Sequence, residues 1–181
     1  MQTSIIEFSV LLFLSLMGPS STLIQLRTTT QIQGEYTKEQ VHQFLATPSN
    51  WPKIVLSSWN VEGTTTTPLK RNDKVDEIFG LPPLLPLSVS WTCVDSDAKK
   101  GLLDVRSPDG LKGIASDCRM LFQVDQEMAN TVSVDLTMEY EPQNLLGTLA
   151  IPVLTIDNAL ALKVLLPNVM KQEMFPKNTT R

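Results

Sequence analysis

Three side chains in this sequence combine a reactive group with an apolar setting. Glu77 has the same strand phase as Val75 and Phe79, and Asp157 lies within a long apolar stretch near the C-terminus. Tyr140 closes the apolar face of another strand and could donate its hydroxyl proton. A carboxyl or hydroxyl group in apolar surroundings can transfer protons as a general acid or base.

Each carboxylate also has a structural explanation. Asp157 would be favoured by the helix dipole if it lies early in a helix. Glu77 would be an ordinary solvated charge if its strand forms the edge of a sheet. The sequence leaves these interpretations open.

Other reactive arrangements are not indicated. The single histidine, His42, has no second metal ligand at a regular spacing, and there is no Ser-His-Asp set, Gly-rich phosphate loop or HExxH motif. We therefore expect no metal and no cofactor, and we place His42 at a solvent-facing or boundary position of a short helix. Cys93 and Cys118 fall on the apolar phase of predicted strands, so we expect unpaired, buried thiols.

The composition is that of one ordinary domain. The chain has 181 residues, a net charge of −4 and a pI near 5.0. The absence of a Lys/Arg cluster argues against nucleic acid or an anionic membrane as an electrostatic partner. We predict a targeting leader over residues 1–22, one domain over residues 23–172 and a flexible tail over residues 173–181.

The leader prediction depends on an apolar run over residues 5–17. The run is followed by Gly-Pro-Ser-Ser and is shorter than the roughly 20 residues of a membrane span, which is typical of a signal segment. Glu7 and the lack of Lys or Arg before the run depart from a secretory leader. Richness in Ser and Thr as far as Thr30 is compatible with an organelle transit peptide, although Arg is scarce.

The clearest secondary-structure pattern lies in the last third of the chain. Over residues 131–141 apolar and polar side chains alternate, and residues 113–125 repeat the pattern. Two half-polar strands side by side indicate an antiparallel sheet. Residues 152–170 follow as a long apolar helix, which we expect to be buried on most of its circumference and kinked or ended early by Pro167.

The upstream segments complete the order. We predict strands over residues 22–33, 56–62, 74–79, 87–93 and 102–106, and a helix that begins at Thr37 with Gln40 as the other half of a capping box. A second short helical turn carries Trp51, and three prolines break regular structure over residues 80–86. The order is strand, two short helices, six strands and a long C-terminal helix.

The sequence around the first helix resembles a known superfamily. Residues 36–45 read Tyr-Thr-Lys-Glu-Gln-Val-His-Gln-Phe-Leu and residues 48–52 read Pro-Ser-Asn-Trp-Pro. In this order of elements they resemble the START-like superfamily, also called SRPBCC, polyketide cyclase/dehydrase and lipid transport, or birch-allergen-like. The resemblance covers about residues 23–170. Residues 140–142, 151–154, 157–158 and 165–167 look like the plant and algal plastid members in particular.

The resemblance implies an α+β helix-grip fold, in which a curved antiparallel sheet of about seven strands wraps around the C-terminal helix and leaves an elongated apolar cavity. The alternative is that aromatic and Met side chains fill this space completely. Polar selectivity would come from Ser116, Tyr140 or Glu77. The candidate ligand-binding residues are Trp59, Phe79, Leu81, Leu84, Val89, Trp91, Cys118, Met120, Phe122, Leu136, Met138, Tyr140, Leu160 and Val164.

The loop over residues 80–86 lies at one mouth of the implied cavity. Its Gly80-Leu81-Pro82 is similar to the gate loop of plant abscisic-acid receptors, but residues 107–112 do not contain the His-Arg-Leu latch of those receptors. Hormone sensing is therefore not expected. The loop would be either a mobile apolar lid or a rigid turn packed on Trp91 or on the C-terminal helix.

These observations favour a protein that binds or carries a hydrophobic small molecule, such as a lipid, isoprenoid, quinone or pigment-like ligand. The alternatives are a polyketide cyclase/dehydratase-type enzyme that uses Glu77, Asp157 or Tyr140, and a coenzyme-Q-binding chaperone. We expect a plastid location, with the secretory pathway as the alternative. The expected partners are the ligand and, transiently, a membrane; the sequence does not indicate an oligomeric state.

Overall fold

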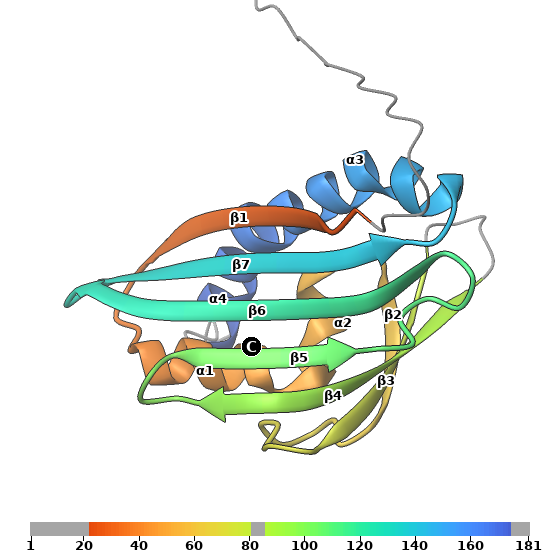
Figure 1. The fold of residues 1–181 in the computed structure, drawn as a ribbon. Helices are drawn as coiled ribbons and strands as arrows, with labels where there is room; N and C mark the ends of the chain where they lie inside the picture. Colours follow the sequence, from red (N-terminus) through yellow and green to blue (C-terminus); the bar gives the residue numbers. More distant parts are fainter. Residues whose placement is uncertain (1–21, 81–85, 175–181) are drawn as a thin grey trace, which may run out of the picture.

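The computed structural model describes residues 22–80 and 86–174 (Figure 1). The predicted leader, Leu81 and Leu84 with most of their loop, and nearly all of the predicted tail lie outside the described residues. Seven antiparallel strands form one curved sheet in the order β1-β7-β6-β5-β4-β3-β2, which confirms the predicted α+β architecture. The strands are β1 (Ile24–Gln33), β2 (Ser58–Gly63), β3 (Lys74–Phe79), β4 (Leu87–Asp97), β5 (Leu102–Ser107), β6 (Ala115–Met128) and β7 (Thr131–Pro142).

A short helical segment connects the two edge strands of the sheet. It comprises α1 (Lys38–Ala46), a 3₁₀ turn η1 (Pro48–Asn50) and α2 (Trp51–Ile54). The capping box is confirmed, because Thr37 Oγ1 accepts from the Gln40 amide while Gln40 Oε1 accepts from the Thr37 amide. The Trp51 indole donates to the Leu45 carbonyl at 2.8 Å, so α2 is fixed against α1. This segment lies behind the sheet in Figure 1.

The C-terminal helix consists of α3 (Leu145–Leu160), a π-helical turn η2 (Ala161–Leu165) and α4 (Leu166–Met174). The predicted start at residue 152 was wrong. Asn144 Oδ1 accepts from the amides of Leu146 and Gly147 and caps the helix there, so Pro152 lies inside it.

Pro167 does not end the helix. The Leu166 amide bonds to the Ala161 carbonyl five residues earlier, which makes a wider turn immediately before the proline. A proline has no amide to donate and its ring crowds the carbonyl four residues back, and the wider turn accommodates both effects. The helix then continues through Met174.

Burial of this helix differs from the expectation. Its inner face packs on the sheet through Ala161, Leu162, Leu166 and Met170, which are all buried. The prediction that most of its circumference is buried was wrong, since a row of large apolar side chains on the outer face is exposed by 37% to 71%. We call this row the outer stripe; it consists of Leu145, Leu146, Leu149, Val153, Ile156, Leu160 and Val164.

By length and composition alone, the helical stretch Leu145–Glu173 could cross a membrane. Only 22% of its most apolar 18-residue segment is buried in the protein. Core helices of soluble proteins meet the same criterion, and this helix packs on its own sheet. We therefore describe it as part of the domain. Figure 1 shows α3 near the edge of the sheet that β1 forms.

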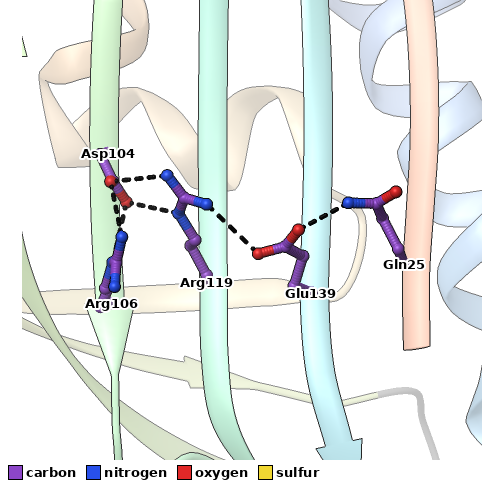
Figure 2. Close-up of polar contacts among 5 residues, drawn as sticks. All are labelled: Gln25, Asp104, Arg106, Arg119 and Glu139. Atoms are coloured by element: carbon purple, nitrogen blue, oxygen red, sulfur yellow. Dashed lines mark hydrogen bonds and ion pairs between the residues drawn. The ribbon is translucent and has the colours of Figure 1, made fainter. Parts of the chain in front are cut away.

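The two faces of the sheet differ as the alternation predicts. Apolar residues of β6 and β7, such as Phe122, Val124 and Val134, are buried against the helices. On the opposite face a polar network crosses four strands (Figure 2): Arg119 donates to both Asp104 oxygens at 3.0 and 2.9 Å and to Glu139 at 3.3 Å, and Gln25 donates to Glu139 at 2.6 Å. This network ties β5, β6, β7 and β1 together.

Two further expectations can be compared with the structure. The placement of His42 at an exposed or boundary position was wrong: the side chain is buried, and its Nε2 donates to the Leu102 carbonyl at 2.9 Å. Because α1 packs on the sheet, the imidazole joins it to β5. The prediction for Cys93 and Cys118 is confirmed, since both thiols are buried and unpaired.

Candidate functional site

A cavity lies between the curved sheet and the helices. The space open to the centre of a water molecule is about 70 Å³, several times the minimum that one water needs. The sheet lines it with Glu77, Phe79, Trp91, Met120, Phe122, Leu136 and Met138. The helices and the loop before β2 line it with Leu45, Trp51, Ile54, Val55, Ser57, Leu154, Asp157, Asn158, Ala161 and Leu162.

A second compartment of about 50 Å³ lies next to the first and shares Phe79, Trp91, Met138 and Leu154 with it. Its other walls are Val89, Leu111, Ile114, Ala115, Cys118, Tyr140, Gly147 and Ala150. The shared side chains stand between the two compartments, which lie next to each other and are both mostly apolar.

Most of the candidate ligand-binding residues lie around this space. Phe79, Val89, Trp91, Cys118, Met120, Phe122, Leu136, Met138 and Tyr140 line one compartment or both. Leu81 and Leu84 lie outside the described residues. The structure places the remaining candidates elsewhere: Trp59 is exposed on β2, and Leu160 and Val164 belong to the outer stripe. Ser116 accepts from the Gln143 side chain at 2.6 Å and does not line the space.

The sequence analysis missed the walls that the helices supply. Trp51 and Ile54 are three residues apart on α2, and Leu154, Ala161 and Leu162 lie on the inner face of the C-terminal helix. The spacing of Trp51 and Ile54 is the signal that could have placed both on one helix face. A helix that is apolar all round gives no such signal for its inner side.

Glu77 and Asp157 reach the cavity from opposite walls. Glu77 comes from β3 and Asp157 from α3, and each is only 7% exposed. The Trp91 indole donates to Glu77 Oε2 at 2.8 Å, and the Ser57 hydroxyl donates to Asp157 Oδ2. Both carboxyl groups therefore have one oxygen fixed by a neighbouring side chain.

The surroundings of Glu77 favour its protonated form. Burial raises the pKa of Glu77 above the ordinary value, and the nearby Asp157 raises it further. The Ser58 hydroxyl and the Trp91 indole act in the opposite direction without reversing the shift. A buried carboxyl group with a raised pKa is a candidate general acid or base.

The structural explanations for the two carboxylates do not fit their positions. The strand β3 is not an edge strand, because β2 lies outside it, and Glu77 is buried. Asp157 lies twelve residues after the start of α3, well beyond the first turn, so the positive end of the helix dipole does not account for it. Two buried carboxyl groups thus face one apolar cavity.

The hydroxyl group of Tyr140 is engaged in the structure. It donates to the Gly147 carbonyl at 3.0 Å and so ties β7 to the first turns of α3. Burial raises the pKa of this phenol, and Cys118 adds to the shift. Close approach at this point needs Gly147, because a Cβ there would lie 2.4 Å from the Ile114 carbonyl oxygen. Tyr140 therefore has an anchoring contact as well as a place in the cavity wall.

Within the described part of the chain, no group of three or more His, Cys, Asp or Glu side chains could hold a metal ion. The cavity walls instead combine aromatic and aliphatic side chains with a few polar atoms at one end. This combination is typical of sites for small organic molecules.

Solved structures show which fold this arrangement shares. The Zhui aromatase/cyclase of a Streptomyces species superposes with a TM-score of 0.67 at 11% identity, over 84% of this chain and 96% of that one. The major latex-like protein 151 of Panax ginseng gives 0.56 at 14% identity, over 74% and 93%. Norcoclaurine synthase of Thalictrum flavum, solved with dopamine and hydroxybenzaldehyde, gives 0.53 at 11% identity, over 78% and 86%.

The chain has the START-like, birch-allergen-like helix-grip fold. This confirms the fold that the sequence resemblance implied. No protein-family profile and no curated protein sequence matches the chain. The comparisons give no support to a closer likeness to plastid members.

Proposed function

We propose that this protein binds and carries a hydrophobic small molecule in the space between the sheet and α3. The observation that carries the proposal is the pair of adjacent apolar compartments that the surrounding side chains leave unfilled. Transfer of apolar surface into it would supply affinity at about 25 cal/mol per Å². The fold also supports the proposal, because the similar norcoclaurine synthase was solved with two small aromatic molecules.

Native mass spectrometry of the chain from residue 23 onward, purified from a lipid-containing extract, tests this proposal directly. We expect a retained molecule at one per chain, or stoichiometric uptake of the neutral fluorescent probe N-phenyl-1-naphthylamine. An empty protein that takes up no probe would contradict the proposal.

A pair of matched variants places the bound molecule. Ala161→Phe adds a ring to the cavity wall, and Ala129→Phe makes the same change at the exposed turn between β6 and β7. We expect the first variant to lose at least tenfold in probe affinity and the second to bind as the wild type does. Equal binding by both variants would show that the probe binds elsewhere.

The outer stripe supports a membrane as the source or destination of the ligand. From Leu145 to Leu160 the exposed positions of α3 carry no charge, and the next exposed residue is Lys163. The inner face of the same helix lines the cavity through Leu154 and Asp157. A helix resting on a bilayer by its outer stripe would hold the cavity beside the apolar phase in which such ligands dissolve.

An enzyme of the cyclase/dehydratase type is the second candidate, and the raised pKa of Glu77 in an apolar cavity is the observation that favours it. The molecule recovered from the native protein can be incubated with the wild type and with Glu77→Gln. Conversion by the wild type alone, with equal binding by both, would favour the enzyme. Equal recovery of the unchanged molecule would favour the carrier.

A plastid location stays a prediction from the sequence. Fusion of residues 1–22 to a fluorescent protein tests it, and entry of the fusion into the secretory pathway would contradict it.

A further inference from the structure

The acidic end of the cavity contains hydrogen-bond acceptors that the described residues leave unused. Trp91 engages Glu77 only at Oε2, and Ser57 engages Asp157 only at Oδ2. Within the described part of the chain, Glu77 Oε1 and Asp157 Oδ1 have no such partner. Ser58 Oγ lies beside Glu77, is fully buried and completes no hydrogen bond with any described group. Buried polar atoms normally find partners, so the buried, unpartnered Ser58 hydroxyl beside the Glu77 carboxyl group calls for an explanation.

Ser58 and the two carboxyl groups belong to one place. Ser57 and Ser58 are successive residues before and at the start of β2; the first reaches Asp157, and the second lies beside Glu77. The two carboxyl groups also act on each other electrostatically. No Lys, Arg or His side chain is among the described residues that line either compartment. The residues that line these walls therefore supply no positive charge to the two carboxyl groups.

The polar group that fits must supply several donors and positive charge. An ammonium group has three N–H donors and no acceptor, and its positive charge would hold both carboxyl groups in their ionised, hydrogen-bond-accepting form. A carboxylate head would meet like charge. A quinone presents only acceptors and would bring no cation to the two carboxyl groups. Trp51, Trp91 and Phe122 line the same compartment, and aromatic side chains can also attract a cation.

We infer that Glu77, Asp157 and Ser58 bind the protonated amine of an otherwise apolar ligand. The inference rests on the proposed function and names the chemical class of its ligand as a hydrophobic amine. The apolar part of the molecule would extend between the sheet and α3 toward the second compartment.

Three naphthalene probes that differ only in their polar group test the inference. They are 2-(aminomethyl)naphthalene, 2-naphthalenemethanol and 2-naphthoate, and binding at pH 7 is followed by titration calorimetry. We expect the amine to bind at least about tenfold more tightly than the alcohol, because hydrogen bonds to charged groups are the stronger kind. The naphthoate should bind most weakly.

Variants assign the preference to the three residues. Glu77→Gln and Asp157→Asn keep the side-chain shape, and each should reduce amine affinity about tenfold while changing alcohol affinity less than threefold. Ser58→Ala is a smaller change that keeps both carboxyl groups, and it should weaken amine binding in the same direction. Glu62→Gln is the matched control, since it removes an exposed carboxylate from the neighbouring strand. It should leave the affinities for all three probes unchanged.

The outcomes separate this inference from the proposed function. If none of the probes binds, the carrier proposal itself is contradicted. If the alcohol and the amine bind equally, or the naphthoate binds as tightly as the amine, the apolar site stands and the amine assignment is overturned. Loss of amine preference in Glu62→Gln would likewise overturn it, because the effect would then come from overall charge.

Discussion

The outer stripe gives the prediction whose size follows most directly from the structure. Leu149 and Ile156 are 59% and 61% exposed, so more than half of each side chain remains available for burial against a membrane. Complete burial of such a side chain contributes about 1.5–3 kcal/mol, so the exposed part of each is worth roughly 1–2 kcal/mol. Replacing both with Gln should weaken membrane partitioning by about 2–4 kcal/mol, or roughly 30- to 1,000-fold.

The same substitutions should hardly change the folded protein. Both side chains already face solvent, and substitutions at such positions usually alter the free energy of unfolding by less than about 0.5 kcal/mol. Gln is also at least as favourable as Ile in a helix. Urea unfolding therefore serves as the internal control, because a loss of membrane binding with unchanged stability cannot come from unfolding.

Co-sedimentation with neutral phosphatidylcholine vesicles measures the partitioning, with Met128→Gln as the matched control. Met128 is 68% exposed but lies at the end of β6, away from the stripe. We expect this variant to partition as the wild type does. Equal partitioning of the double variant and the wild type would refute the assignment, and so would a wild type that does not bind vesicles at all.

Three further predictions concern buried or paired groups. Arg106 and Arg119 lie directly opposite each other on β5 and β6, and the Asp104 carboxylate accepts hydrogen bonds from both. Asp104→Asn removes this negative charge and should lower the free energy of unfolding, measured by urea titration, by about 1–3 kcal/mol. Burial opposes ionisation of Asp104, but the hydrogen bonds from the two arginines outweigh it and lower its pKa. The stabilisation by Asp104 is thus fully present above the ordinary Asp pKa near 4 and is lost as the pH falls through the lower pKa of the folded state. In that acid range the free energy of unfolding of the variant should depend less on pH than that of the wild type. The same pH dependence in both proteins would count against this account. Glu77→Gln should stabilise the protein at pH 7. Because burial raises the pKa of Glu77, the wild type loses stability as the pH rises above the pKa of the unfolded state near 4.3, whereas Gln does not titrate. A variant that is less stable than the wild type at pH 7 would oppose this reasoning. Burial raises the pKa values of Cys93 and Cys118 to about 11. A thiol reagent at pH 8 should therefore label these cysteines only as the protein unfolds. Rapid labelling of the folded protein would contradict their burial.

The alternating strands were predictable because each has one face in the core. In β7 the period of two separates Val134 and Leu136 from Asp135 and Thr137, and the burial follows it. Trp59 departs from this rule. The register of β2 against β3 shifts between Ser58 and Asn60, and a sequence gives no direct sign of such a bulge.

The start of α3 shows a second limit of prediction from the sequence. Pro152 is a common kind of first helical residue, whereas the true signal is the single Asn144 that caps the first turn. The missed two turns contain Leu145, Leu146 and Leu149, which are nearly half of the outer stripe. An error in one helix boundary therefore concealed a surface as well as seven residues of helix.

The acidic end of the cavity could be predicted only in parts. Local phase was enough to select Glu77 and Asp157 separately, but they are 80 positions apart in the sequence, and periodicity does not report contacts at that distance. The curvature of the sheet brings β3 and α3 to the two sides of one space. The partners Ser57 and Ser58 carried no signal, because serine before a strand usually marks a turn.

The C-terminal helix connects these observations physically. A helix that is apolar all round is normally buried all round, yet here the protein covers only one side. The exposed fractions of the outer stripe add up to roughly four whole side chains, or about 6–12 kcal/mol of apolar burial that folding leaves unused. Folding alone gives no reason for that surface, because polar residues at the same positions would preserve every contact of the inner face. The proposed carrier function would give a reason. The outer stripe and the side chains that line the cavity belong to one helix, so docking of the stripe on a membrane would place Asp157 and the cavity beside the apolar phase from which the ligand would come.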